Sequence, residues 1–131
     1  MPIPEGGPLT RLADGAVRVA PGGTARGRVT PPPSKSLSHR AFNLALLAGE
    51  ELTVERPLQA EDTHLFRTAL AALGWTVEPR GDDVHLTPGE RPPSAEILCG
   101  NAGTMYRFLV AALAALPGDW RLDGVPRLRE R

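Results

Sequence analysis

The segment from Pro33 to Arg40, Pro-Ser-Lys-Ser-Leu-Ser-His-Arg, gathers side chains that bind phosphates and carboxylates. It holds Lys35, the only lysine in a chain with 15 basic residues, next to the hydroxyl of Ser36 and before Arg40. A compact ammonium in a chain that otherwise uses arginine suggests a site that requires lysine. An arginine one helical turn further can hold an anion through two parallel hydrogen bonds. We therefore expect an anion site here; the alternative is an ordinary helix start with solvated cations.

A glycine-rich segment from Gly100 to Arg107, Gly-Asn-Ala-Gly-Thr-Met-Tyr-Arg, is the second candidate. Gly103 would let a ligand approach the backbone closely, and Thr104 could cap a helix that begins there. The segment has neither the lysine of a phosphate loop nor the third glycine of a dinucleotide fingerprint. Arg107 has two open roles, because it could line a site or tie the helix to a nearby carboxylate.

Basic residues also alternate near the C-terminus, where Gly-Val-Pro-Arg-Leu-Arg-Glu-Arg occupies residues 124–131. On an extended segment Arg127, Arg129 and Arg131 would project to one side, and we expect this arrangement. A solvated, charged tail is the alternative. No metal site is expected, because the three histidines lack the spacing of metal ligands and Cys99 is the only cysteine.

Three helices and several strands must position these groups. The first helix is predicted from Ser34 or Ser36 to about Ala48, because the prolines at 31–33 favour extended geometry before it and serine caps a helix start. Gly49 would end the helix in a left-handed conformation. The apolar spacing predicts a helix face made of Leu37, Ala41, Leu44 and Ala48.

Two further helices are predicted at residues 61–73 and 104–116. Strands are predicted at residues 17–19, 26–29, 51–55, 75–78, 84–86, 95–99 and 120–122, the fourth and fifth forming a hairpin. His85 is expected on the solvated face of its strand, and Cys99 in the core. The alternation indicates an α/β fold with a weak internal repeat. Residues 1–16, rich in proline and glycine, are predicted to be a flexible lead-in.

Composition limits the function classes. A chain of 131 residues can bury one modest core, so we expect one domain or part of one. A net charge of zero and 5% aromatic residues argue against a nucleic-acid partner. The apolar runs are too short to span a membrane, and no signal peptide is expected. A single cysteine fits a reducing compartment, so we expect a cytoplasmic protein.

The three segments together resemble the N-terminal part of the 5-enolpyruvylshikimate-3-phosphate synthase family, also called 3-phosphoshikimate 1-carboxyvinyltransferase. Pro-Ser-Lys-Ser-Leu-Ser-His-Arg, Gly-Asn-Ala-Gly-Thr and Pro-Arg-Leu-Arg-Glu-Arg occur in this order, and the resemblance covers residues 17–131. It implies repeated βαβαββ units of an inside-out α/β barrel, of which about one and a half are present. It also implies transfer of the enolpyruvyl group of phosphoenolpyruvate to the 5-hydroxyl of shikimate 3-phosphate, without a metal or organic cofactor.

The resemblance also implies roles for individual residues. Lys35 would contact both substrates and act in catalysis, while Ser36 and Arg40 would hold shikimate 3-phosphate. The residues expected at the phosphoenolpyruvate site are Gly103 and Arg131, with Asn101 and Thr104 shaping the loop. Arg107 matches a family arginine whose role stays open. The chain departs from the family at Pro33, often glycine, at His39, often asparagine, and at Met105-Tyr106.

Two alternatives stay open. One is the related enzyme that transfers enolpyruvyl to UDP-N-acetylglucosamine, and another is a non-catalytic anion-binding domain that is complete at 131 residues. A truncated unit would leave apolar helix faces and sheet edges uncovered. We therefore expect this chain to be inactive alone and to self-associate or be marginally stable, whereas a full-length form would be a monomer. Its partners would be the two small substrates, without nucleic acid or membrane.

Overall fold

The computed structural model describes residues 9–21 and 26–130, and the chain divides into two units, residues 1–31 and 32–131. In the first unit, strands β1 (Leu9–Arg11) and β2 (Val17–Val19) form an antiparallel pair. The strand predicted at residues 17–19 is therefore confirmed. Its partner β1 falls within the predicted lead-in, whose residues 1–8 lie outside the described part. The strand predicted at residues 26–29 is wrong, because this exposed segment pairs with no described strand.

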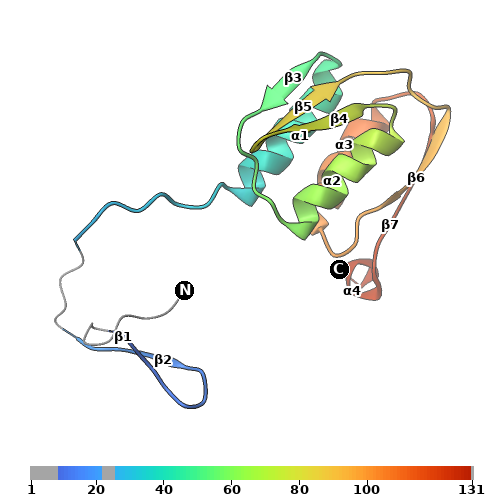
Figure 1. Cartoon of the computed structure of the whole chain (residues 1–131). Coiled ribbons are helices and arrows are strands. Elements are labelled where there is room, and N and C mark those ends of the chain that lie inside the picture. The colour runs from blue at the N-terminus through green and yellow to red at the C-terminus, as the bar shows by residue number, and fades with distance from the viewer. Residues whose placement is uncertain (1–8, 22–25, 131) are drawn as a thin grey trace. The chain divides into compact units, whose positions relative to one another are not determined.

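The second unit alternates helices and strands (Figure 1), and its α/β character is confirmed. Its elements are α1 (Lys35–Ala48), β3 (Leu52–Val54), α2 (Glu61–Ala72), β4 (Thr76–Arg80), β5 (Asp83–Thr87), β6 (Ser94–Leu98), α3 (Gly103–Ala114), β7 (Asp119–Asp123) and α4 (Pro126–Arg129). The three long helices and all five strands were predicted from the sequence to within a few residues at each end. Helix α4 was not.

The strands of the second unit form two small sheets. Strands β3, β5 and β4 lie in that order in an antiparallel sheet, and β4 and β5 make the predicted hairpin. Strands β6 and β7 are parallel, with Ile97 opposite Leu122, and α3 is the helix that connects them. A parallel pair needs such a crossover connection. The crossover brings the loop before α3 and the end of β7 to the same edge of the sheet.

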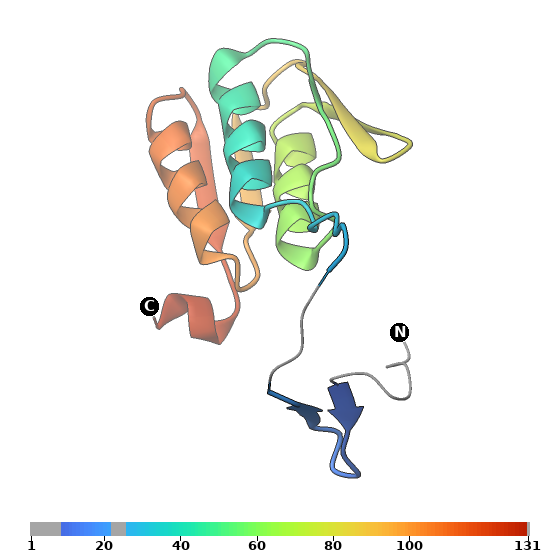
Figure 2. The same cartoon turned by 90° about the vertical axis from the view of Figure 1, so that its left-hand side faces the viewer.

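The three long helices form one layer over these strands. Helix α1 packs against both α2 and α3, and Figure 2 shows it between them, with the strands β6 and β7 behind the helices. The core lies between the layers and is made of Phe42, Leu46, Phe66, Leu70, Val84, Leu86, Ile97, Cys99, Met105, Leu109 and Leu113, among other buried residues. The rings of Phe42 and Phe66 lie 5.8 Å apart. Cys99 is buried in the core as predicted.

The apolar face predicted for α1 is for the most part not the face that packs against the core. Leu37 and Leu44 are 66% and 62% exposed, whereas Phe42, Ala45 and Leu46 are buried. The helix carries apolar residues on two faces, and periodicity cannot tell which of them meets the core. The buried face of α1 also contains two polar residues, Ser38 and His39.

His85 is a second correction, since it lies buried in the central strand β5 rather than on a solvated face. Its Nδ1 is 2.8 Å from Oγ1 of Thr53, and its Nε2 is 2.9 Å from Oε1 of Glu51. These two polar partners compensate the burial of the imidazole. Strand β5 is flanked on both sides by other strands, which the alternating pattern around His85 did not indicate.

The C-terminal basic segment is the third correction. Residues 126–129 form the short helix α4 rather than an extended chain, because Pro126 at the first helical position already has a helical φ. On a helix, residues two apart lie on nearly opposite sides, so Arg127 and Arg129 diverge. Arg131 lies outside the described residues. No helix within residues 9–21 and 26–130 has the length and apolarity to cross a membrane.

Candidate anion-binding site

A pocket of about 310 Å³ opens where the starts of the long helices meet. We call it the anion pocket, and its lining residues are Lys35, Asp62, Asn101, Gly103, Thr104, Tyr106, Arg107 and Leu128. These residues come from the first turns of α1, α2 and α3, the loop before α3, and α4. The pocket therefore joins parts of all three sequence segments that suggested anion chemistry.

The start of α1 presents Lys35 to this pocket. Ser34 caps the helix, and its Oγ accepts a hydrogen bond from the amide of Leu37. Lys35 is thus the first helical residue, where unpaired amides and the helix dipole favour an anion. The first turn of α1 contains no acidic residue. A lysine there opposes the dipole, and a bound anion would remove this conflict.

A hydrogen-bond network places the start of α2 beside the start of α1. Buried Ser38 donates through Oγ to the carbonyl of Ser34 and accepts from the amide of Leu58. Thr63 donates through Oγ1 to the carbonyl of Leu58 and accepts from the amide of Ala60. Two buried hydroxyls thus join α1, the connecting loop and α2. The network fixes the position of the acidic residue that precedes Thr63.

That residue is Asp62, whose Oδ2 lies 2.8 Å from Nζ of Lys35. The lysine side chain is 51% exposed and the aspartate side chain 27% exposed. Water and salt screen such a pair, so it is a weak contributor to stability. Its main effect is to hold the ammonium in one direction at the pocket wall. An anion that enters would compete with Asp62 for the same ammonium.

The start of α3 forms the opposite wall. Gly100 has a φ of 56°, and its carbonyl accepts a hydrogen bond from the amide of Val125. The helix begins at Gly103, and the preceding residue, Ala102, has no side chain that could cap it. The predicted cap at Thr104 is therefore wrong, since this residue lies inside the first turn. Without a capping side chain or an acid in this turn, the first amides of α3 suit an anion.

Arg107 lies one turn into α3 and lines the anion pocket with Tyr106. None of the ion pairs between described residues involves Arg107. The alternative in which it ties α3 to a neighbouring carboxylate thus receives no support from this part of the chain. Arg107 adds a second positive charge to the pocket, opposite Lys35.

Ser36 and Arg40 are not among the residues that line the anion pocket. Arg40 donates through Nη1 to Oγ and to the carbonyl of Ser36, the latter at 3.2 Å. Its guanidinium also lies over the ring of Phe108, 5.9 Å from the centroid, a distance at which a cation and an aromatic face attract. Both residues are exposed on α1 next to Lys35. They could contact a ligand that extends beyond the pocket.

His39 lies inside the protein rather than at the site surface. Its side chain is fully buried against Phe66, and neither ring nitrogen has a hydrogen-bond partner among described residues. Burial lowers the pKa of His39, and the backbone and charge of Asp62 oppose this shift in part. The residue is therefore a neutral imidazole behind the site at neutral pH, and it offers no positive charge to an anion.

Sequence reasoning missed three residues of the pocket. These residues are Asp62, Tyr106 and Leu128, to which the sequence analysis gave no role at a site. The Lys35–Asp62 pair joins residues 27 positions apart on different helices, which no local pattern indicates. Among residues 9–21 and 26–130, no cluster of three histidine, cysteine or acidic side chains could hold a metal ion.

Comparison with known proteins agrees with the family resemblance of the three sequence segments. Residues 19–131 match the family model described as EPSP synthase (3-phosphoshikimate 1-carboxyvinyltransferase). The chain is 44% identical over 117 residues to the 3-phosphoshikimate 1-carboxyvinyltransferase of Ralstonia pickettii, with 86% of this chain and 27% of the relative covered. It is 44% identical over 128 residues to that of Cupriavidus necator, with 95% of this chain and 26% of the relative covered.

Solved structures agree with the sequence relatives. EPSP synthase from Acinetobacter baumannii superimposes with a TM-score of 0.70 and 29% sequence identity, over 80% of this chain and 25% of that one. The present chain thus spans about a quarter of the length of the proteins it matches. The enolpyruvyl transferase fold expected from the three motifs is confirmed for this quarter.

Proposed function

This chain belongs to the EPSP synthase (3-phosphoshikimate 1-carboxyvinyltransferase) family, and we propose that it supplies one wall of that enzyme's substrate site. The proposed reaction transfers the enolpyruvyl group of phosphoenolpyruvate to the 5-hydroxyl of shikimate 3-phosphate. Because the chain spans about a quarter of its relatives, it would not carry out this reaction alone. The remaining groups would come from other parts of a longer enzyme.

The observation that carries this proposal is the convergence of Lys35 and Arg107 on one pocket whose walls are helix starts without acids on α1 and α3. Both substrates are phosphate esters, and both also carry a carboxylate. Helix amides and cations at such a position bind these groups together. Asp62, the one acid among the described residues that line the pocket, is already paired with the ammonium of Lys35.

In the proposed reaction, a new bond forms between the 5-hydroxyl oxygen and the carbon of phosphoenolpyruvate that bears the phosphate. The bond from that carbon to the phosphate oxygen breaks, and inorganic phosphate leaves. The proton of the 5-hydroxyl ends on the released inorganic phosphate, so atoms and charges balance without a cofactor. Lys35 would stabilise the negative charge that gathers on the departing phosphate, as a positioned cation does in a transition state.

The other proposed roles follow the family resemblance. Gly103 would let phosphoenolpyruvate approach the backbone, and Asn101 and Thr104 would shape the loop around it. Ser36 and Arg40 would hold shikimate 3-phosphate on the exposed side of α1. Arg131, which lies outside the described residues, would also bind phosphoenolpyruvate. The proposed enzyme acts in the cytoplasm as a monomer.

A chimera tests this function. Residues 19–131 replace the matching quarter of the Cupriavidus necator relative, and phosphate release is measured with both substrates. We expect turnover in the chimera, and a loss on the order of a hundredfold in kcat for Lys35→Arg, because the planar guanidinium cannot reproduce the ammonium position. Arg80→Gln, which removes an exposed cation in the β4–β5 hairpin, is the matched control and should leave kcat unchanged.

Two outcomes would contradict the proposal. A folded chimera without turnover would show that this chain cannot serve as the substrate wall. Near-normal turnover of Lys35→Arg would remove the role given to the lysine. Binding gives a further check, since inorganic phosphate titrated into the 131-residue chain should shift the amide resonances of Asn101, Gly103 and Thr104 in nuclear magnetic resonance spectra.

A further inference from the structure

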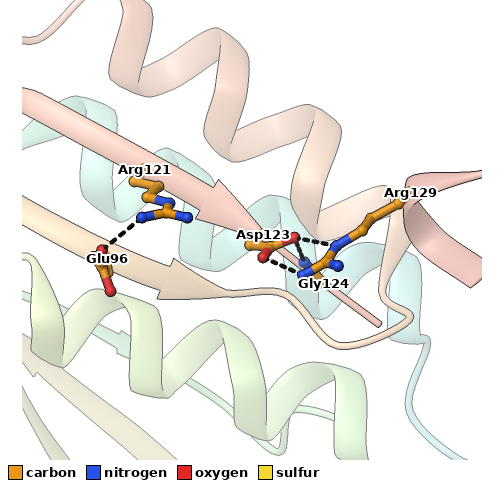
Figure 3. Close-up of polar contacts among 5 residues, drawn as sticks. All are labelled: Glu96, Arg121, Asp123, Gly124 and Arg129. Atoms are coloured by element: carbon orange, nitrogen blue, oxygen red, sulfur yellow. Dashed lines mark hydrogen bonds and ion pairs between the residues drawn. The ribbon is translucent and has the colours of Figure 1, made fainter. Parts of the chain in front are cut away.

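An ion pair outside the anion pocket joins the end of β7 to α4 (Figure 3). Arg129 donates from Nε to Oδ1 of Asp123 at 2.8 Å and from Nη2 to Oδ2 at 2.5 Å. The carboxylate also accepts a hydrogen bond from the amide of Gly124 at 2.7 Å. This two-pronged contact fixes the direction of the guanidinium as well as its distance. It closes a tight loop between a strand and a helix.

The same end of β7 is bound to the loop that precedes α3. The amide of Cys99 donates to the carbonyl of Asp123 at 2.7 Å, and the amide of Val125 donates to the carbonyl of Gly100 at 3.0 Å. Gly124 lies so close that an added Cβ would come within 2.5 Å of the Gly100 carbonyl oxygen. The segment after β7 is therefore packed directly on the backbone that leads into Asn101 and Gly103.

Besides this ion pair, helix α4 is held mainly by Leu128, which is partly buried and packs against the core. It has four residues, none of them buried, and no side chain caps its start. A single helical turn is unstable by itself, because the first turn fixes several residues for one hydrogen bond. Yet α4 carries Leu128, which lines the anion pocket. The Asp123–Arg129 pair connects this turn to the sheet.

We propose that Asp123 and Arg129 are positioning residues of the anion pocket: their ion pair holds α4 against the loop before α3 and thereby sets the wall formed by Leu128 and Asn101. The proposal rests on the proposed function of that pocket. Neither residue lines the pocket, so both act through the residues that do. The pair is charged over the whole neutral range, since Arg129 and the Gly124 amide lower the pKa of Asp123 to about 2.

A neighbouring pair supplies the matched control. Arg121 donates to Oε1 of Glu96 at 3.2 Å across the same two strands, β7 and β6, and both side chains are exposed. Figure 3 shows the two pairs along the sheet, with only the Asp123–Arg129 pair reaching α4. Glu96→Gln removes an ion pair of the same kind without touching the connection to α4.

The first measurement is amide hydrogen exchange in the 131-residue chain. We expect Asp123→Asn to speed exchange at Val125 and Leu128 by about tenfold or more, as a locally opened turn would. Exchange at Leu70 in the core should not change, which shows that the variant is folded. Glu96→Gln should leave all three amides unchanged. Unchanged exchange at Val125 and Leu128 in Asp123→Asn would overturn the proposal.

The second measurement follows inorganic phosphate and phosphoenolpyruvate by amide shifts of Asn101 and Gly103. We expect Asp123→Asn to weaken binding by about threefold to tenfold, Arg129→Lys to weaken it less, and Glu96→Gln to leave it unchanged. Equal affinities in Asp123→Asn and the unaltered chain would reduce the pair to a purely structural role and overturn the proposal. Absence of any shift in the unaltered chain would instead overturn the proposed function, and the positioning role with it.

Discussion

Lys35 and Asp62 stand at the starts of two neighbouring helices, with Nζ of the lysine 2.8 Å from Oδ2 of the aspartate. The contact holds the half-exposed ammonium in one position at the wall of the anion pocket. It also occupies that ammonium with an internal carboxylate when no ligand is bound. The aspartate therefore orients the ammonium and also competes with an anion for it. Mutation can separate these two effects.

Removing the competing charge should strengthen anion binding. We expect Asp62→Asn to tighten phosphate binding to the 131-residue chain by about twofold to fivefold, the size expected for one partly exposed charge. Glu61→Gln is the matched control, because it removes the other acid from the same helix turn and does not line the pocket. Amide shifts during a phosphate titration give both affinities. Weaker binding in Asp62→Asn would show that orientation outweighs competition.

Loss of the ammonium should have the opposite effect. Lys35→Ala is expected to weaken phosphate binding by about tenfold or more, since charge-assisted hydrogen bonds contribute about 1.5 to 3 kcal/mol each. The free energy of unfolding should change little, because the Lys35–Asp62 pair is exposed and screened. Titration and urea unfolding of the same sample separate the two quantities. A large loss of stability with unchanged affinity would place the lysine among structural residues.

Gly100 is expected to be intolerant of a side chain. Its φ of 56° is unfavourable for other residues, and an added Cβ would lie 2.7 Å from Cδ1 of Leu65. Gly81 has a similar φ of 64° but open space around it. Gly81→Ala should therefore cost about 1 kcal/mol of unfolding free energy from backbone strain. Gly100→Ala should cost at most about 1 kcal/mol more, because the contacted atom is the end of the flexible Leu65 side chain and can shift. A much larger difference in urea unfolding would show that Leu65 cannot move.

Stability should fall in mildly acidic solution because of His39. Its pKa is lowered in the folded protein by burial, so the unfolded chain binds the proton more tightly. The folded state is therefore most favoured above the unfolded pKa, about 6.5, and loses free energy as the pH falls below it. The loss is about 1.4 kcal/mol for each unit between the two pKa values.

Urea unfolding between pH 7.5 and 5 measures this slope, and His39→Asn should flatten it. Asn is the residue that the family resemblance associates with this position. His64→Asn is the control, because His64 is exposed on α2. An unchanged slope in His39→Asn would mean that another group controls the acid sensitivity.

The exposed apolar face of α1 should make the 131-residue chain self-associate. Leu37, Leu44 and Leu47 are 66%, 62% and 50% exposed and follow one side of the helix. Such a stripe on a chain that spans a quarter of its relatives favours pairing with a second copy. We expect concentration-dependent association in sedimentation experiments and its loss in Leu44→Lys. Leu98→Lys, equally exposed at 64% on β6, should leave association unchanged.

Local signals account for most of what the sequence predicted correctly. Ser34 and Gly49 mark the ends of α1 because a serine cap and a left-handed glycine act within one helical turn. The hairpin of β4 and β5 follows from alternation on both sides of a glycine turn. The pocket residues of the loop before α3 were predicted from their motif, and the structure brings four of the seven expected site residues, Lys35, Asn101, Gly103 and Thr104, to one pocket.

Tertiary relationships account for what the sequence did not reveal. Helix α1 has two apolar faces, and only packing against α2 and α3 decides that Phe42 is buried and Leu44 is not. His85 is buried because β5 is the central strand of its sheet. Asp62 lies at the site because hydrogen bonds from Ser38 and Thr63 to Leu58 hold the start of α2 beside the start of α1. None of these contacts has a signature within one element.

The anion pocket draws its walls from segments spread between Lys35 and Leu128, so it exists only while α1, α2, α3 and α4 are assembled. A ligand that binds there and not to the unfolded chain must raise the melting temperature through mass action. At a concentration one hundred times its Kd, the gain would be about 2.7 kcal/mol. The concentration of such a ligand would then govern the occupancy of the pocket and also the lifetime of this part of the protein against unfolding and proteolysis.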